Sequence, residues 1–142
     1  MKIAVIGSRK FKVEDLGQYL PEGATEIVSG GAAGIDTCAR EYAVANGIKI
    51  TEFLPDYARY GRGAPIRRNL QIIDHADMVL AFWNGSSRGT KHVIDICRKK
   101  NKNLKIFIVK LIVKITFALY YPLFERLCFT SEIGFVDHIT CK

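Results

Sequence analysis

A glycine-rich turn separates a short apolar run, Glu26 to Val28, from an amphipathic run, Thr37 to Ala45. The turn holds three glycines within five positions, in the sequence Ser29-Gly-Gly-Ala-Ala-Gly34. Glycine has no Cβ, so the backbone can adopt positive φ and lie close to a ligand, and the first N–H groups of the following helix have no intrahelical acceptor. This order of strand, turn and helix favours an anion, most often phosphate. The alternative is that the glycines only let the helix pack closely on the sheet.

Two further turns of similar character follow other apolar runs. Ile3 to Ile6 ends at Gly7-Ser8-Arg9, and Met78 to Phe82 ends at the Gly/Ser-rich residues 84–90. Short apolar runs that alternate with helical patterns predict an α/β fold, a Rossmann-like, mostly parallel sheet flanked by helices. Ligands of such sheets bind in the crevice outside the carboxyl ends of the strands. We therefore expect the three turns to converge on one ligand.

The remaining elements are predicted from apolar spacing. Two strands and three helices are expected at these places: strands at Ile48–Phe53 and Lys105–Val109, and helices at Val13–Leu20, at Ile66–Ile73 and around Val93, Ile94 and Cys97.

Residues 56–70 are interpreted as a basic and aromatic loop, with Arg59, Arg62, Arg67 and Arg68 and no acidic residue beyond Asp56. The planar arginine fork matches phosphate oxygens, so the cluster predicts a ligand clamp. The apolar pattern after Pro65 places the last two arginines at the start of a helix, where cations oppose the helix dipole. A bound anion would relieve that conflict. The alternative is a solvated basic loop.

Charge and length divide the 142-residue chain into two parts. Residues 1–110 carry 18 Lys and Arg against 11 Asp and Glu, whereas residues 111–142 carry three of each, so anionic ligands are favoured in the first part. We interpret 1–110 as a single domain and 111–142 as an apolar C-terminal extension of unknown role. The apolar runs of this extension fall short of the ~20 residues that span a bilayer. No membrane partner is expected, and a homo-oligomer is left open.

The four cysteines have neither C-x-x-C spacing nor an adjacent histidine. This pattern favours reduced thiols in a cytoplasmic protein and gives no ligand set for a metal. No resident cofactor is expected.

Five short motifs in order resemble a YspA-type domain of the SLOG superfamily, a group that also contains the DprA recombination mediators and the Lonely-Guy phosphoribohydrolases. The resemblance covers about residues 1–110. It implies a Rossmann-like sheet whose Ser-Gly-Gly and Gly-Thr turns hold a nucleotide or a nucleotide derivative. The motifs are Ile6-Gly-Ser-Arg-Lys-Phe11, Ser29-Gly-Gly-Ala-Ala-Gly-Ile-Asp36, Phe53-Leu-Pro-Asp-Tyr57, Ile66-Arg-Arg-Asn69 and Ala81-Phe-Trp-Asn-Gly-Ser-Ser-Arg-Gly-Thr-Lys-His92.

The resemblance also implies which residues face the ligand. The first strand ends in a ligand-facing loop, the glycine-rich turn binds phosphate, and Asp36 accepts a ribose hydroxyl or caps the helix. The expected binding residues are Gly7, Ser8, Arg9, Ser29, Gly30, Gly31, Gly34, Asp36, Arg68, Asn69, Gly85, Gly89 and Thr90.

Three functions follow from these observations. The first is a binding module, a sensor of a nucleotide or nucleotide-derived phosphorylated ligand. The second is a phosphoribohydrolase-like enzyme with Asp36 or His92 as acid or base, although Lys91, His92 and Val93 stand where such enzymes place a glutamate after the Gly-Thr turn. The third is single-stranded DNA binding as in DprA relatives, with Tyr57 and Tyr60 as stacking platforms. Whether there is turnover is left open.

Overall fold

The computed structural model describes residues 1–109, and the expected C-terminal extension lies outside these residues. Within residues 1–109, no helix combines the length and the apolar character that crossing a membrane requires. The elements are β1 (Lys2–Gly7), the 3₁₀ turn η1 (Gly17–Tyr19), β2 (Glu26–Ser29), α1 (Ile35–Ala45), β3 (Lys49–Glu52), α2 (Tyr57–Tyr60), the 3₁₀ turn η2 (Gly61–Gly63), α3 (Ala64–His75), β4 (Met78–Trp83), α4 (Arg88–Lys99) and β5 (Asn103–Ile108).

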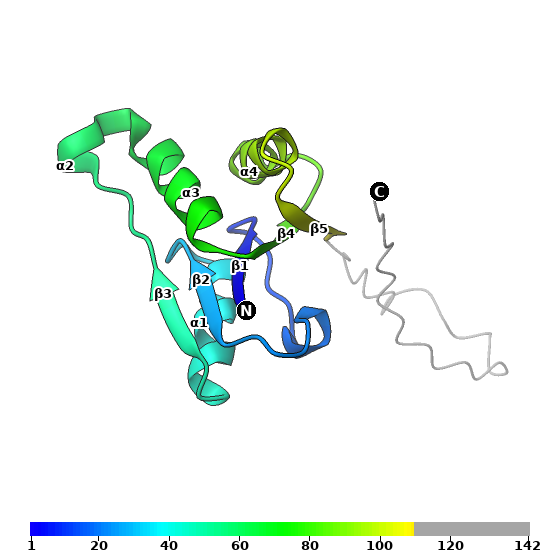
Figure 1. Cartoon of the computed structure of the whole chain (residues 1–142). Helices are drawn as coiled ribbons and strands as arrows, with labels where there is room; N and C mark the ends of the chain where they lie inside the picture. The colour runs from blue at the N-terminus through cyan, green and yellow to red at the C-terminus, as the bar shows by residue number, and fades with distance from the viewer. Residues whose placement is uncertain (110–142) are drawn as a thin grey trace, which may run out of the picture.

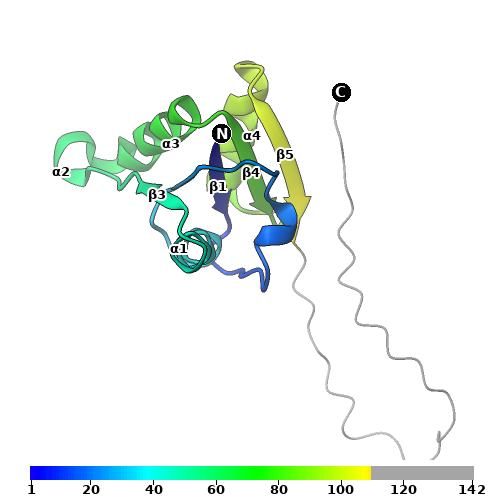
Figure 2. The same cartoon turned by 60° about the horizontal axis from the view of Figure 1, so that its bottom comes forward.

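The five strands form one parallel sheet in the order β3-β2-β1-β4-β5. Helix α1 covers one face of this sheet, and α3 and α4 cover the other (Figure 1). The short helix α2 lies outside these layers, as a second view shows (Figure 2). The predicted Rossmann-like α/β fold is confirmed.

Strand β1 is buried on both faces because it lies in the middle of the sheet. Successive side chains of a strand point to opposite faces, so Ile3 and Val5 join the core cluster under α1, whereas Ala4 and Ile6 join the cluster under α3 and α4. Burial on both faces explains why the strand reads as a continuous apolar run.

The predicted helix at Val13–Leu20 is wrong. The structure has only the three-residue turn η1 there, and the Asp15 side chain accepts the Gly17 N–H at 2.8 Å. A local side-chain bond of this kind competes with helix formation. The apolar spacing reflects burial and not a helix, because Leu16 is buried in the core cluster under α1.

The predicted loop at 56–70 is largely helical, because α2, η2 and the start of α3 occupy it. Asp56 starts α2 by accepting the Arg59 backbone N–H at 2.9 Å. The expected helix after Pro65 is confirmed, with this proline at the beginning of α3.

A buried carboxylate ties β2, β3 and α3 together at the amino end of the strands. The Glu26 carboxylate lies 2.8 Å from His75 Nε2, accepts the Thr51 hydroxyl at 2.8 Å and the Lys49 ammonium at 3.1 Å. The bond with His75 is the largest cause that lowers the pKa of Glu26 from 4.5 to about 2, while burial opposes it. The ionised form is therefore the one that the fold stabilises.

We predict that Glu26→Gln lowers the free energy of unfolding by about 1–3 kcal/mol at pH 7, because a carboxamide cannot accept all three bonds. The folded pKa lies below the unfolded one, so this contribution is present above about pH 4.5 and is lost as the pH falls toward 2. Urea unfolding at a series of pH values measures it. The exposed Glu22→Gln is the control and should stay within about 0.5 kcal/mol of the wild type. Equal stability of the two variants would contradict the role of Glu26.

Candidate functional site

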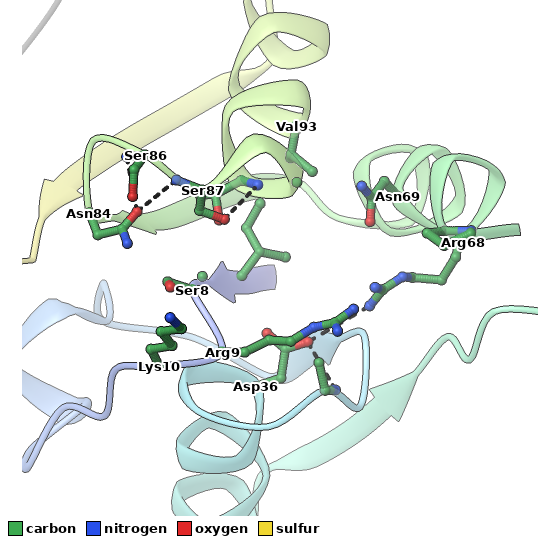
Figure 3. A pocket seen from close by; sticks show the side chains of 16 residues that line it. Ser8, Arg9, Lys10, Asp36, Arg68, Asn69, Asn84, Ser86, Ser87 and Val93 are labelled. Atoms are coloured by element: carbon green, nitrogen blue, oxygen red, sulfur yellow. Dashed lines mark hydrogen bonds and ion pairs between the residues drawn. The ribbon is translucent and has the colours of Figure 1, made fainter. Parts of the chain in front are cut away.

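A cavity of about 410 Å³ opens at the carboxyl ends of β1 and β4. From β1 the chain continues to β2 and β3 on one side, and it then returns to β4 on the other side. This reversal is the topological switch point at which open parallel sheets bind ligands. We call the cavity at this point the switch-point cavity. Residues after β1, at the start of α1, on α3 and in the β4–α4 turn line it (Figure 3).

The lining of the switch-point cavity carries an excess of positive charge. Arg9, Lys10 and Arg68 line it, and Asp36 is the one carboxylate among the described residues that do so. The side chains of Arg9 and Arg68 extend from opposite sides toward each other (Figure 3). Two neighbouring guanidinium groups with one carboxylate near them create a positive potential that an anion would neutralise.

The Arg68 guanidinium is largely enclosed, with 12% of its side chain exposed, and its nearest charge partner is Asp36 Oδ2 at 3.7 Å. Burial lowers the pKa of Arg68, and the Arg9 charge lowers it further while Asp36 opposes both. An arginine stays charged despite such a shift. Its Nε–H is buried and has no acceptor among residues 1–109. Arg68 is therefore a cation that the protein neutralises only in part.

Asp36 lies in the first turn of α1, with 5% of its side chain exposed. Its Oδ2 accepts the backbone N–H of Ala32 at 3.2 Å. Burial raises the pKa of Asp36, and the bond from Ala32 and the charge of Arg68 oppose this shift. The carboxylate thus occupies an amide of the glycine-rich turn that the sequence pattern assigned to phosphate.

The β4–α4 turn builds the opposite wall. Asn84 Oδ1 accepts the N–H groups of Ser86 and Ser87 at 3.1 and 2.8 Å, and Ser87 Oγ caps α4 by accepting the Thr90 N–H at 3.5 Å. The Trp83 indole N–H donates to the Ser87 carbonyl at 3.1 Å. The amino end of α4, a twelve-residue helix, therefore faces the cavity with a partial positive charge.

The structure brings many of the predicted binding residues together and leaves others outside. Eight of them line the switch-point cavity: Gly7, Ser8, Arg9, Asp36, Arg68, Asn69, Gly89 and Thr90. Five others do not line it: Ser29, Gly30, Gly31, Gly34 and Gly85.

The glycines of the turn serve the packing around the cavity. A Cβ on Gly30 would overlap the Arg68 guanidinium, one on Gly34 would lie 2.6 Å from the Arg9 carbonyl oxygen, and one on Gly31 would lie 2.6 Å from the Leu54 side chain. Gly31 and Gly34 also have positive φ, at 68° and 79°. The turn therefore leaves room for Arg68 and brings the chain after β1 close to α1.

A comparison with protein families adds an independent observation. The family model described as DNA recombination-mediator protein A matches residues 1–80, more than half of the chain. The chain belongs to this family. The resemblance to the SLOG superfamily is thereby confirmed, and a binding role related to nucleotides or DNA is supported. No curated protein matches the chain, and no solved structure does.

The match to the DNA recombination-mediator protein A family ends within β4. It includes the glycine-rich turn, Arg9, Asp36 and Arg68, but not the β4–α4 turn. In this family member, the arginine side of the switch-point cavity is therefore the part that resembles the family model.

Sequence reasoning missed several lining residues, namely Lys10, Asn84, Ser86 and Ser87. Each lies within one of the motifs that carry the resemblance, so membership of a motif was the available signal. His92, an expected acid or base, is not among the lining residues, and its Nε2 is buried without a partner in residues 1–109.

We predict that Gly30→Ala displaces the Arg68 guanidinium, weakens phosphate binding by about tenfold and lowers the free energy of unfolding by about 1–3 kcal/mol, because the buried Asp36 loses its charge partner. Inorganic phosphate titrated by calorimetry measures the affinity, and thermal unfolding measures the stability. Gly63→Ala is the matched control, because a Cβ there meets no atom within 4 Å. Unchanged phosphate affinity in Gly30→Ala would show that anion binding does not depend on the position of the Arg68 guanidinium.

Proposed function

We propose that the switch-point cavity binds the phosphate group of a nucleotide or nucleotide-derived ligand, and that the domain acts as a sensor of this ligand. The observation that carries the proposal is the pair of guanidinium groups, Arg9 and Arg68, which meet in a cavity with a single lining carboxylate (Figure 3). Arginine binds phosphate oxygens through paired N–H groups. The N–H groups of Ser86, Ser87 and Thr90 are already bound by Asn84 Oδ1 and Ser87 Oγ, so α4 contributes the partial positive charge of its amino end from the opposite wall.

The dimensions and polarity of the cavity support a small ligand. A volume of about 410 Å³ lies in the range of small-molecule sites. Neutral polar side chains also line the cavity, among them Ser8, Asn69 and Asn84. Hydroxyl and carboxamide groups donate and accept hydrogen bonds, which suits a ribose or a base beside the phosphate.

The lining favours binding over hydrolysis of an N-glycosidic bond. Such hydrolysis needs a carboxylate that stabilises positive charge at the ribose or activates water. Asp36 is the one carboxylate of the described lining, and it is already engaged by the Ala32 N–H and the Arg68 guanidinium. We therefore assign it a positioning role toward Arg68. Incubation with nucleoside monophosphates should release no base above the blank.

We predict that Arg9→Ala weakens binding of adenosine 5′-monophosphate by at least about tenfold. Arg9 is exposed and makes no ion pair within residues 1–109, so its removal spares the fold. Binding can be followed by the fluorescence of Trp83, the one tryptophan of the chain, whose indole contacts the cavity wall at Ser87. Ligand-induced thermal stabilisation is the second measurement.

Arg62→Ala is the control for this experiment, because Arg62 is an exposed arginine that does not line the switch-point cavity. An equal loss of nucleotide affinity in Arg9→Ala and Arg62→Ala would show that the effect comes from general surface charge. An Arg9→Ala protein that binds the nucleotide as the wild type does would contradict the proposed site.

Single-stranded DNA binding is a second candidate, favoured by the family and by one structural observation. Tyr57 is 58% exposed beside Arg59 on α2, and exposed tyrosines interleaved with arginines suit stacked bases and their phosphates. We predict that Tyr57→Ala weakens binding of a labelled oligothymidylate by about tenfold, measured by anisotropy at two salt concentrations. Val44→Ala, an exposed apolar residue on α1, is the control. This candidate would be excluded if neither salt nor Tyr57→Ala changed the affinity for the oligothymidylate.

A further inference from the structure

A second cavity, of about 250 Å³, lies beside the switch-point cavity between the end of β3 and the helices α2 and α3. Arg59, Arg67 and Arg68 supply its positive charge. Arg68 lines both cavities, so the two cavities meet at this residue. The two cavities are therefore neighbours that share one cation.

Two arginines of the second cavity are held together by an aromatic ring. The guanidinium carbons of Arg59 and Arg67 lie 5.1 and 5.7 Å from the centroid of the Tyr60 ring. A cation near an aromatic face is attracted by the ring quadrupole. The attraction to the ring thus offsets part of the repulsion between the two guanidinium groups.

The acidic residues of the second cavity are engaged elsewhere. Glu52 Oε1 accepts two bonds from the Arg40 guanidinium, at 3.0 and 2.8 Å. Asp56 Oδ1 accepts the backbone N–H of Arg59 at the start of α2. Neither Arg59 nor Arg67 has an ion pair with a carboxylate of residues 1–109. Arg59, Arg67 and Arg68 outnumber the two carboxylates of this lining, and Arg59 and Arg67 are not paired with either, so the cavity favours an anion.

We propose that the second cavity is a second phosphate subsite, so that the ligand is a nucleotide with a further phosphate beyond the one held by Arg9 and Arg68. This inference rests on the proposed nucleotide site and names the ligand class that it takes. A polyphosphate chain and a phosphodiester link to a second nucleotide present the same chemistry here. Arg68 contacts both phosphates, and Arg59 and Arg67 bind the further one.

The experiment compares three probes that share one base, each without added metal: adenosine 5′-monophosphate, ATP and the 5′-phosphorylated dinucleotide pApA. Calorimetry on the full chain gives the three dissociation constants. We expect ATP or pApA to bind at least about tenfold more tightly than the monophosphate, the effect of one further charge-assisted contact. Whichever probe gains identifies the source of the second phosphate.

The double variant Arg59→Ala/Arg67→Ala should remove this gain and leave the affinity for the monophosphate unchanged. Tyr60→Leu keeps both charges but not the ring, and it should lose part of the gain. Arg62→Ala is the matched control, because Arg62 lies in η2, next to α2 in the chain, and lines neither cavity. It should keep the full gain.

Three results would overturn the second subsite while the nucleotide site stands: equal affinity of the wild type for all three probes, a gain that survives in the double variant, or the same loss in Arg62→Ala. In each of these the monophosphate still binds. Failure of every probe to bind the wild type would overturn the nucleotide site and the second subsite together.

Discussion

A guanidinium group that is largely enclosed by protein must be compensated, because burial of a charge without a partner costs several kcal/mol. In this chain the group belongs to Arg68, and its compensation comes from Asp36 at 3.7 Å. Asp36 is fixed by the first turn of α1, and the space for the guanidinium exists because residue 30 is a glycine. The glycine-rich turn, α1 and α3 are thus tied at one edge of the sheet by a single ion pair.

This pair would leave the cavity neutral if no other charge faced it. Arg9 and Lys10 also line the cavity, and burial, with the Arg9 charge as a smaller cause, lowers the pKa of Arg68. Like charges this close cost free energy in the empty site. A bound anion would offset this repulsion between the cations. The arrangement is therefore better suited to an anionic ligand than to stability alone.

Local patterns were sufficient to predict the sheet, and the family resemblance implied eight of the residues that line the switch-point cavity. The apolar runs identified the strands, and glycine-bearing turns at their carboxyl ends identified the edge where Arg9, Asp36, Arg68 and Asn69 meet. The pattern at Val13–Leu20 failed because Asp15 bonds to Gly17 within a turn, and periodicity does not register such a bond. The role of Gly30 was beyond sequence reasoning, because it depends on a side chain 38 residues further along the chain.

The contacts of Asp36 show how a carboxylate is compatible with the proposed anion site. The sequence pattern assigned the amides of the glycine-rich turn to phosphate, but the Asp36 carboxylate takes the amide of Ala32. In the proposed site, phosphate would therefore be bound by the arginine side chains and stabilised by the partial charge at the amino end of α4. A guanidinium has five N–H donors, so Arg68 can face Asp36 with one edge and an anion with another. The Asp36 carboxylate orients Arg68, and the unpaired positive charge of Arg9 would still attract an anion.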